Sequence, residues 1–318
     1  MTTEFEKKVY NQLYASSIIF LKDGIERLVN KDNGDIDVID NDLLSLTCTS
    51  FQISIELAIK ALIIERSGLK NVIEKKYHLL SEEEIELKFL NNELKSLEFE
   101  MQKNFVKKNQ FIQDLTKNDY KIIDSFQKYR NRIVHFTYNF DDADLNALKH
   151  DMIYYMIQII FKILLSKKHQ DERPSEFLEY TLGRGLHKQL ISYRPYVSAM
   201  EKLAKANSPV VLNCIICFNR TLSQYEEYCY CCNFLTEGFT LIDCDYCKVK
   251  KSVIYDNLNI ALNDNTARGE CLNCGNDGII FECPECGKAH NIETNFDNEK
   301  CSNEECLNKS AVLELPTN

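Results

Sequence analysis

Residues 128–136, Lys-Tyr-Arg-Asn-Arg-Ile-Val-His-Phe, combine side chains that suit phosphate chemistry. Arg130 is followed directly by Asn131, and His135 stands five positions after Arg130. A guanidinium can hold two phosphate oxygens at once, and an imidazole exchanges a proton near neutral pH. Cutting or binding RNA would need both groups. The sequence therefore marks Arg130 and His135 as candidate catalytic residues.

An amphipathic helix from residue 119 to about residue 136 is expected to position these side chains. Arg130 and His135 are about 140° apart around its axis, so they can flank one groove but cannot stack on each other. Lys128 and Arg132 are expected to form a local basic cluster with Arg130. Apolar residues recur at helical spacing and predict one buried stripe, made of Ile122, Phe126, Tyr129, Ile133 and Phe136.

The Arg130-Asn131 pair and His135 resemble the R-x4-6-H signature of HEPN domains, in which Asn frequently follows the Arg. A second stretch, residues 54–64 (Ser-Ile-Glu-Leu-Ala-Ile-Lys-Ala-Leu-Ile-Ile), resembles the early helix of many HEPN domains, which carries an E-L-A-x-K-A-L core. The two stretches stand in the expected order within residues 1–170. The resemblance implies an α-helical bundle over those residues.

The same resemblance implies a metal-independent endoribonuclease, often a toxin or an antiviral defence effector. The RNA 2′-hydroxyl would attack the adjacent phosphate and leave 2′,3′-cyclic phosphate and 5′-hydroxyl ends. His135 would act as general acid or base, Arg130 would hold the phosphate, and Asn131 would position His135 or the RNA. HEPN sites typically form where two such helices meet across a two-fold axis, so RNA and a second copy are the expected partners. An antitoxin or a trigger protein is a further partner that the resemblance suggests.

One residue departs from the pattern of some HEPN toxins, which carry a Tyr two residues after the His as the target of a nucleotidyltransferase antitoxin. Here Tyr138 stands three residues after His135. Regulation by nucleotide transfer to this Tyr is therefore not expected.

A helix from about residue 42 to residue 67 carries a polar strip on an otherwise apolar pattern. Two interpretations of Glu56 and Lys60 stay open: a solvated i,i+4 ion pair, or side chains that face the catalytic helix and orient it. Residues 81–112 are strongly charged and are expected to be helical, and Ser81 with Glu84 forms a capping-box pattern. This segment is expected to be an elaboration between the two HEPN-like stretches.

The charge of the chain excludes a general polyanion binder, because the formal net charge is −10. Residues 1–168 hold 24 basic and 26 acidic residues, and the remaining part carries −8. RNA would therefore have to bind a local basic cluster. The N-terminus shows no signal-peptide pattern, and the apolar run over residues 152–165 is too short to span a bilayer. A cytoplasmic protein without membrane contact is expected.

Cysteines crowd the last third of the chain: of 14, only Cys48 precedes residue 214. In a chain with no export signal this indicates metal binding more than disulfides. Five C-x2-C pairs and one wider pair predict structural Zn²⁺ sites with no catalytic role, and iron–sulfur binding is the less favoured interpretation. The predicted ligands are Cys214, Cys217, Cys229, Cys232, Cys244, Cys247, Cys271, Cys274, Cys283, Cys286, Cys301 and Cys306.

Spacing does not decide how the pairs combine, because sequential and interleaved pairing are both compatible with tetrahedral sites. Two to three zinc ions are expected, with Cys231 left over. Gly275 and Gly287 directly follow a C-x2-C pair and suit tight turns. The expected organisation is a HEPN-like helical domain over residues 1–170, a helical linker over 171–208 and a small β-rich zinc-ribbon array over 209–318. The alternative to a nuclease is a non-catalytic HEPN-like binding module whose zinc ribbons dock a protein or nucleic-acid partner.

Overall fold

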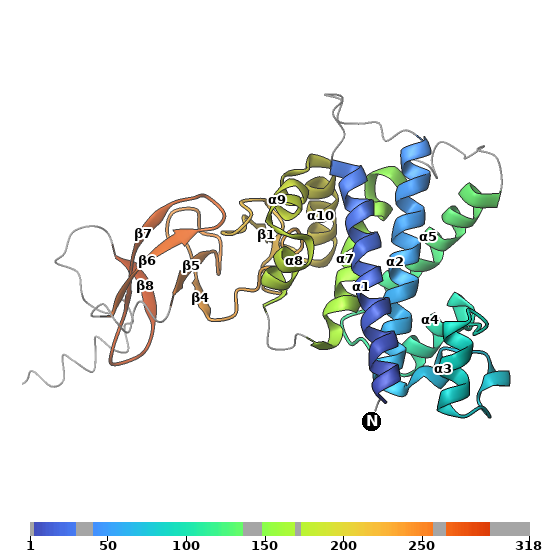
Figure 1. The fold of residues 1–318 in the computed structure, drawn as a ribbon. Coiled ribbons are helices and arrows are strands. Elements are labelled where there is room, and N and C mark those ends of the chain that lie inside the picture. The colour runs from blue at the N-terminus through green and yellow to red at the C-terminus, as the bar shows by residue number, and fades with distance from the viewer. Residues whose placement is uncertain (1–2, 30–40, 136–147, 169–172, 257–264, 293–318) are drawn as a thin grey trace, which may run out of the picture. The chain divides into compact units, whose positions relative to one another are not determined.

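The computed structural model describes residues 3–29, 41–135, 148–168, 173–256 and 265–292, and the chain divides into two compact units (Figure 1). The first unit, Met1–Met200, is helical, and the second, Glu201–Asn318, is β-rich. The boundary falls within helix α10 (Arg194–Asn207). The expected fold class, a helical N-terminal part followed by a small β-rich region that carries cysteine clusters, is confirmed.

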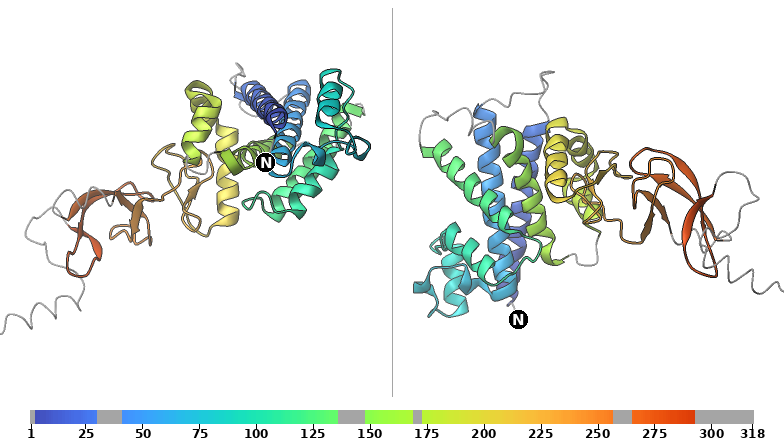
Figure 2. Two further views of the ribbon diagram at one scale, coloured as in Figure 1. Left: turned by 60° about the horizontal axis from the view of Figure 1, so that its bottom comes forward. Right: turned by 180° about the vertical axis from the view of Figure 1, so that it is seen from behind.

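Helices α1 (Glu4–Val29) and α2 (Asn41–Ser67) form a tightly packed pair, with α7 (Ile153–Lys168) beside them (Figures 1 and 2). Gly24 permits the close approach, because a Cβ at this position would lie 2.4 Å from the ring of Phe51. Two buried serines bridge the helices: Ser17 Oγ donates to the carbonyl of Ser54, and Ser54 Oγ donates to the carbonyl of Ser17, each at 2.8 Å. The reciprocal bonds satisfy hydroxyl groups that would otherwise be buried without partners.

Helix α2 is the central helix of the bundle. Its segment Leu43–Ser67 is long and apolar enough to cross a membrane, but 72% of the most apolar window is buried within the protein. Burial of this kind is typical of the core helix of a globular domain. The helix ends at Ser67, the bound expected from the sequence. The following residue, Gly68, has φ 86° and donates its N–H to the carbonyl of Ile64 at 2.9 Å.

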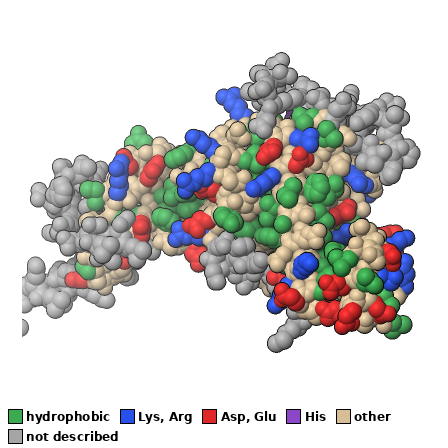
Figure 3. All heavy atoms as spheres, in the orientation of Figure 1, with side chains coloured by type: hydrophobic (Ala, Val, Ile, Leu, Met, Phe, Trp, Pro, Cys, Tyr) green, Lys and Arg blue, Asp and Glu red, His purple; other side chains and the backbone are tan. Residues whose placement is uncertain are grey.

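The charged segment after α2 folds into two short helices, α3 (Glu82–Leu90) and α4 (Phe99–Lys108). The expected capping box at Ser81 and Glu84 is present at the start of α3. Asn92 adopts the left-handed conformation, with φ 57°, in the turn that follows α3. Acidic side chains gather on the surface over α3 and α4 (Figure 3). Two 3₁₀ turns, η1 (Leu69–Asn71) and η2 (Lys75–Tyr77), connect α2 to this pair.

Helix α5 (Lys117–His135) packs against α2 and α7, and its N-terminus is fixed by side chains. Thr116 and Asp119 exchange hydrogen bonds: Thr116 N–H donates to Asp119 Oδ2 at 2.8 Å, and Asp119 N–H donates to Thr116 Oγ1 at 3.1 Å. Asp119 also accepts a hydrogen bond from Lys162 Nζ of α7 at 3.2 Å. A π-helical turn, η3 (Leu148–Met152), leads into α7.

Residues 173–207, which fall in the segment we expected to be a helical linker, form α8 (Pro174–Leu182), α9 (Arg184–Ser192) and α10. Helix α8 packs against α7, where the rings of Phe161 and Phe177 meet edge to face with their centroids 6.4 Å apart. Helix α9 packs against α1. Gly183 has φ 81° at the corner between α8 and α9. Helices α8 and α9 thus belong to the helical unit.

The described residues of the second unit form two antiparallel sheets. The smaller sheet has the strand order β1-β2-β3, and the larger is a five-stranded meander, β4-β5-β6-β7-β8. The hydrophobic core under the larger sheet includes Val253, Tyr255 and Ile280. The strands are β1 (Val211–Leu212), β2 (Leu222–Ser223), β3 (Tyr228–Cys229), β4 (Phe239–Ile242), β5 (Val253–Asp256), β6 (Thr266–Cys271), β7 (Asp277–Glu282) and β8 (Ala289–Ile292).

Candidate metal centres and the Arg130 helix

Four cysteines of the small sheet converge on one point, and we refer to them as the first cysteine group: Cys214, Cys217, Cys229 and Cys232. The sulfurs of Cys214 and Cys232 are 3.6 Å apart, and those of Cys217 and Cys229 are 3.7 Å apart. All four sulfur atoms lie within 4.8 Å of one another, and all four cysteines are free thiols.

A second cysteine group, Cys244, Cys247, Cys271 and Cys274, has the same geometry beside the larger sheet. The sulfurs of Cys244 and Cys274 are 3.9 Å apart, and those of Cys247 and Cys271 are 3.7 Å apart. Zinc bound tetrahedrally at a Zn–S distance of 2.3 Å requires its sulfurs to be about 3.8 Å apart. Both groups therefore fit a closed four-thiolate zinc site with no coordination position left for a substrate.

Each of the five C-x2-C pairs forms the same turn. The residue after the second Cys is in the left-handed region and donates its N–H to the carbonyl of the first Cys at 2.8–2.9 Å. This position explains the role expected for Gly275 and Gly287, where a side chain would add strain. The five residues at this position are Phe218, Asn233, Lys248, Gly275 and Gly287.

Hydrogen-bond donors lie next to the sulfurs in both groups. Such contacts orient metal ligands and are a regular part of structural sites. In the first group, hydrogen bonds from neighbouring thiols, Cys214 foremost, hold the pKa of Cys217 well below its usual range. The donors within hydrogen-bond distance of a sulfur are Ile216 N–H, Thr221 Oγ1, Cys247 N–H, Ser252 Oγ and Asn273 Nδ2.

The remaining cysteines have different surroundings. Cys231 belongs to neither group, and its buried sulfur accepts a hydrogen bond from Asn219 Nδ2 at 3.4 Å. Cys283 and Cys286 form the fifth turn, but their expected partners Cys301 and Cys306 lie outside the described residues. Cys48 is buried in α2, and this burial raises the pKa of its thiol, so it is an inert core side chain.

Arg130 lies on the side of α5 that faces the bundle. Arg130 stands eleven positions after Asp119 and seven after Ile123, so the three side chains project from the helix in nearly the same direction. Asp119 and Ile123 are buried. Arg130 is half-buried, and its Nη1 donates to Asn131 Oδ1 at 3.2 Å. Its Nε is buried and has no acceptor within the described part of the chain. The guanidinium therefore retains hydrogen-bonding capacity for an anion.

The structure places the other predicted site residues as follows. Asn131 is exposed, and His135 is the last residue of α5, with its side chain outside the described set. Glu56 and Lys60 lie on α2 and are both half-buried. Glu56 accepts a hydrogen bond from Gln52 Nε2 at 2.9 Å, so it is held by the residue one turn earlier. The expected cluster of Lys128, Arg130 and Arg132 is divided between two sides of the helix, because only Lys128 and Arg132 are exposed.

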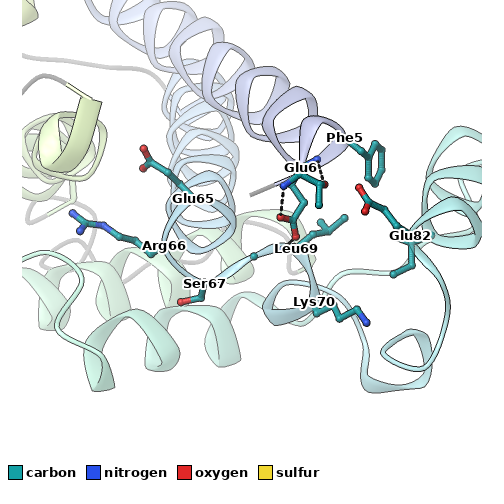
Figure 4. A pocket seen from close by; sticks show the side chains of 11 residues that line it. Phe5, Glu6, Glu65, Arg66, Ser67, Leu69, Lys70 and Glu82 are labelled. Atoms are coloured by element: carbon teal, nitrogen blue, oxygen red, sulfur yellow. Dashed lines mark hydrogen bonds between the residues drawn. The ribbon is translucent and has the colours of Figure 1, made fainter. Parts of the chain in front are cut away.

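A groove of about 730 Å³ lies at the N-terminal end of α1, between the end of α2 and the start of α3 (Figure 4). Carboxylates of Glu6, Glu65 and Glu82 and the cations of Arg66 and Lys70 line it. Glu6 is already used within the fold, since its Oε1 accepts the Leu69 N–H at 2.7 Å. None of the predicted catalytic residues lines this groove.

Comparisons with protein-family models, curated proteins and solved structures gave no match to this chain. The HEPN resemblance therefore rests on the two sequence stretches, within a structure whose N-terminal part is helical. The sequence interpretation missed two exposed lysines of α5, Lys117 and Lys121. Their spacing from Lys128 and Arg132, at intervals of 4, 7 and 4 residues, was the signal that could have identified them.

Proposed function

We propose that this protein is a HEPN-type endoribonuclease whose site is built on α5 from Arg130, Asn131 and His135. The observation that carries the proposal is the state of Arg130. It is half-buried, and its buried Nε lacks an acceptor among the described residues. An unsatisfied buried donor costs about 1–3 kcal/mol, and a phosphate oxygen would remove that cost. A cation partly shielded from water also attracts an anion more strongly than an exposed one.

The reaction requires two proton transfers and no metal. A base takes the proton of the RNA 2′-hydroxyl, whose oxygen attacks the adjacent phosphorus. The P–O bond to the 5′-oxygen breaks, and an acid protonates that leaving oxygen. The products are a 2′,3′-cyclic phosphate and a 5′-hydroxyl, so atoms and charge balance without a cofactor. His135 supplies one of these two transfers, Arg130 stabilises the charge that develops on the phosphate, and Asn131 orients His135 or the RNA.

A homodimer completes this site in the proposal. Arg130 faces the bundle and is about 140° from His135 around the helix axis. One α5 therefore cannot present both groups to the same phosphate from the same direction. Two α5 helices that meet across a two-fold axis would present two histidines, so that His135 of the partner subunit supplies the second proton transfer.

The two cysteine groups are proposed to hold structural zinc, with a third site at Cys283, Cys286, Cys301 and Cys306. Each four-thiolate site carries a formal charge of −2, which adds to the acidity of the second unit. We infer that this unit contributes recognition or folding stability and takes no part in bond cleavage. A toxin or antiviral role, with an antitoxin or trigger protein as partner, is the biological setting that the HEPN resemblance suggests.

A non-catalytic binding module is the second candidate, and one observation favours it. Three aromatic side chains close to the cysteine groups are exposed: Phe218 at 82%, Tyr225 at 81% and Tyr246 at 77%. Phe218 is also held in the left-handed conformation, with φ 59°, which is strained for a bulky side chain. Exposed aromatic residues of this kind are typical of docking surfaces.

Cleavage assays separate the two candidates. Full-length protein and its His135→Ala variant are incubated with RNA in EDTA, and the new RNA ends are identified. The nuclease proposal requires cyclic-phosphate ends from the wild-type protein alone. Binding of RNA or protein without new ends would favour the binding module.

A further inference from the structure

Helix α5 carries a row of cations on the side opposite Arg130. Lys117, Lys121, Lys128 and Arg132 are all exposed. At about 100° per residue their positions fall within about 60° of one another, and at 1.5 Å per residue the row is about 22 Å long. We call these four residues the α5 ridge.

Two of the three acidic residues between positions 103 and 132 are already paired within the fold. Asp124, which lies on the same side of α5, forms an ion pair with Lys103 of α4. Glu100 is bound to the same lysine at 2.6 Å. Asp119 is buried and paired with Lys162 at 3.2 Å. Residues 103–132 hold eight basic and three acidic side chains, a net charge of +5 in a chain of −10. The ridge is therefore a local positive surface on an acidic protein.

Helix α4 widens this positive surface beside the start of α5. The ammonium of Lys107 lies 5.1 Å from the centre of the Tyr120 ring, which fixes this cation next to α5. Lys107 and the neighbouring Lys108 are exposed. The cations thus continue from the end of α4 along the length of α5.

The direction of the row leads to the proposed catalytic position. Residue 135 is 18 residues after Lys117, which is five full turns of an α-helix. The backbone at position 135 therefore lies on the same side of α5 as Lys117. A ligand that follows the ridge reaches the end of α5 at this position.

We propose that the α5 ridge binds the phosphates of single-stranded RNA and carries one strand toward position 135. This inference rests on the proposed function and adds the place and the form of its substrate. A single row of lysine and arginine heads on one helix can follow one phosphate backbone, whereas a duplex presents two. Among the described side chains of α5, none is an exposed aromatic residue on which bases could stack. The ridge therefore binds RNA through its phosphates, without sequence preference.

Binding measured on a non-cleaving protein tests the ridge separately from catalysis. Fluorescence anisotropy follows labelled single-stranded RNA and full-length His135→Ala protein over a series of salt concentrations. Lys117→Gln, Lys121→Gln and Lys128→Gln are then added together to this variant. Each lost phosphate contact lowers the slope of log K against log salt by about 0.7 for a single strand. The triple change is expected to lower the slope by about 2 and to weaken binding at least tenfold at low salt.

A matched control is Lys188→Gln, which neutralises an exposed lysine of α9 and should change neither the slope nor the affinity. Exposed Lys→Gln changes leave folding intact, as unchanged circular-dichroism melting of all variants would show. The ridge proposal is wrong if the triple variant binds RNA as tightly as the His135→Ala protein and with the same salt dependence. It is also wrong if duplex RNA binds better than the single strand. Binding of an acidic peptide in place of RNA would also overturn it.

The outcome is independent of whether the protein cuts RNA. If the three lysine changes abolish RNA binding while wild-type protein leaves RNA uncut, the ridge proposal stands and the nuclease proposal fails. If wild-type protein cuts RNA and the same three lysine changes, made in the wild-type chain, leave the cleavage rate at sub-saturating RNA unchanged, the nuclease proposal stands and the ridge proposal fails.

Discussion

Lys128 and Arg130 are two residues apart and lie on opposite sides of α5. A separation of two residues turns the helix by about 200°. Lys128 is exposed, whereas Arg130 is half-buried and donates a hydrogen bond to Asn131. The two cations are therefore not interchangeable. We assign the first to RNA binding along the ridge and the second to the reacting phosphate.

Arg130→Lys should abolish RNA cleavage although the positive charge is kept. The ammonium cannot replace the planar guanidinium that grips two phosphate oxygens. We expect the rate constant of cleavage under saturating RNA to fall by about 10²-fold or more, by analogy with the loss of a preorganised donor. Single-turnover kinetics measure this rate.

Arg184→Lys is the control for that change, since Arg184 is exposed on α9 and lies outside both the ridge and the proposed catalytic residues. It should keep the cleavage rate close to that of the wild type. Equal activity of the Arg130→Lys protein would remove Arg130 from the site.

Purified protein should contain two to three zinc ions per chain. The two cysteine groups each provide four sulfurs at the spacing that zinc requires, and a third group depends on Cys301 and Cys306. Elemental analysis measures the content, and X-ray absorption should give Zn–S distances of about 2.3 Å. Chelation should unfold the second unit and leave the helical signal of the first, because metal binding supplies the folding free energy of such small sites.

Adjacent cysteines offer a sharp control for the zinc assignment. Cys232→Ser removes a member of the first cysteine group and should lower the zinc content by one ion per chain. Cys231→Ser removes a buried sulfur outside the group and should leave the content unchanged. Protein that contains iron in place of zinc, or equal metal loss in both variants, contradicts the assignment.

Lys103 should be important for the stability of the helical unit. Its side chain is only 5% exposed and pairs with Glu100 and Asp124, which joins α4 to α5. Burial by itself would lower the pKa of Lys103, but hydrogen bonds to Asp124 and Glu100 raise it above the usual value. A raised pKa contributes stability below the unfolded-state pKa, and this contribution is lost only as the pH rises through the folded-state value. At pH 7 it is fully present.

Lys103→Ala should therefore destabilise the unit by about 1–3 kcal/mol at neutral pH, through loss of packing and of the ion pairs. A change of 1 kcal/mol corresponds to about 2–4 °C in melting temperature for a unit of this size. Lys108→Ala, at the exposed end of the same helix, is the control and should change the melting temperature by little. Equal effects of the two substitutions would show that the buried pair is unimportant.

The protein should be a homodimer in solution, because one α5 directs Arg130 and His135 to different sides. Light scattering on the full chain measures its molar mass. A protein that cuts RNA as a strict monomer at the assay concentration would contradict the composite site.

Local signals in the sequence predicted the elements well. The helix end before Gly68 and the capping box at Ser81 follow from backbone geometry and short-range hydrogen bonds, which the chain specifies within a few residues. The C-x2-C turns are local in the same sense. How these turns combine into sites depends on strand pairing over tens of residues, and spacing alone left two solutions open. The structure brings together consecutive pairs in both cysteine groups.

The surroundings of single side chains were harder to predict. The helical period gives the angle between Arg130 and Lys128, but neighbouring helices decide which of the two directions is buried. The partner of Glu56 was missed for a similar reason. Lys60 and Gln52 are both one turn away from Glu56, and the hydrogen bond forms with Gln52. Competition between two local partners is settled by tertiary packing.

The most direct test of the account is to map RNA ends after incubation with the full-length protein in EDTA. Because the proposed chemistry uses only imidazole and guanidinium, cleavage should leave 2′,3′-cyclic phosphate and 5′-hydroxyl ends. The His135→Ala protein, with the same zinc content, should cut at least about 10²-fold more slowly. Cleavage of RNA by the His135→Ala protein at the wild-type rate would contradict the proposed site on α5.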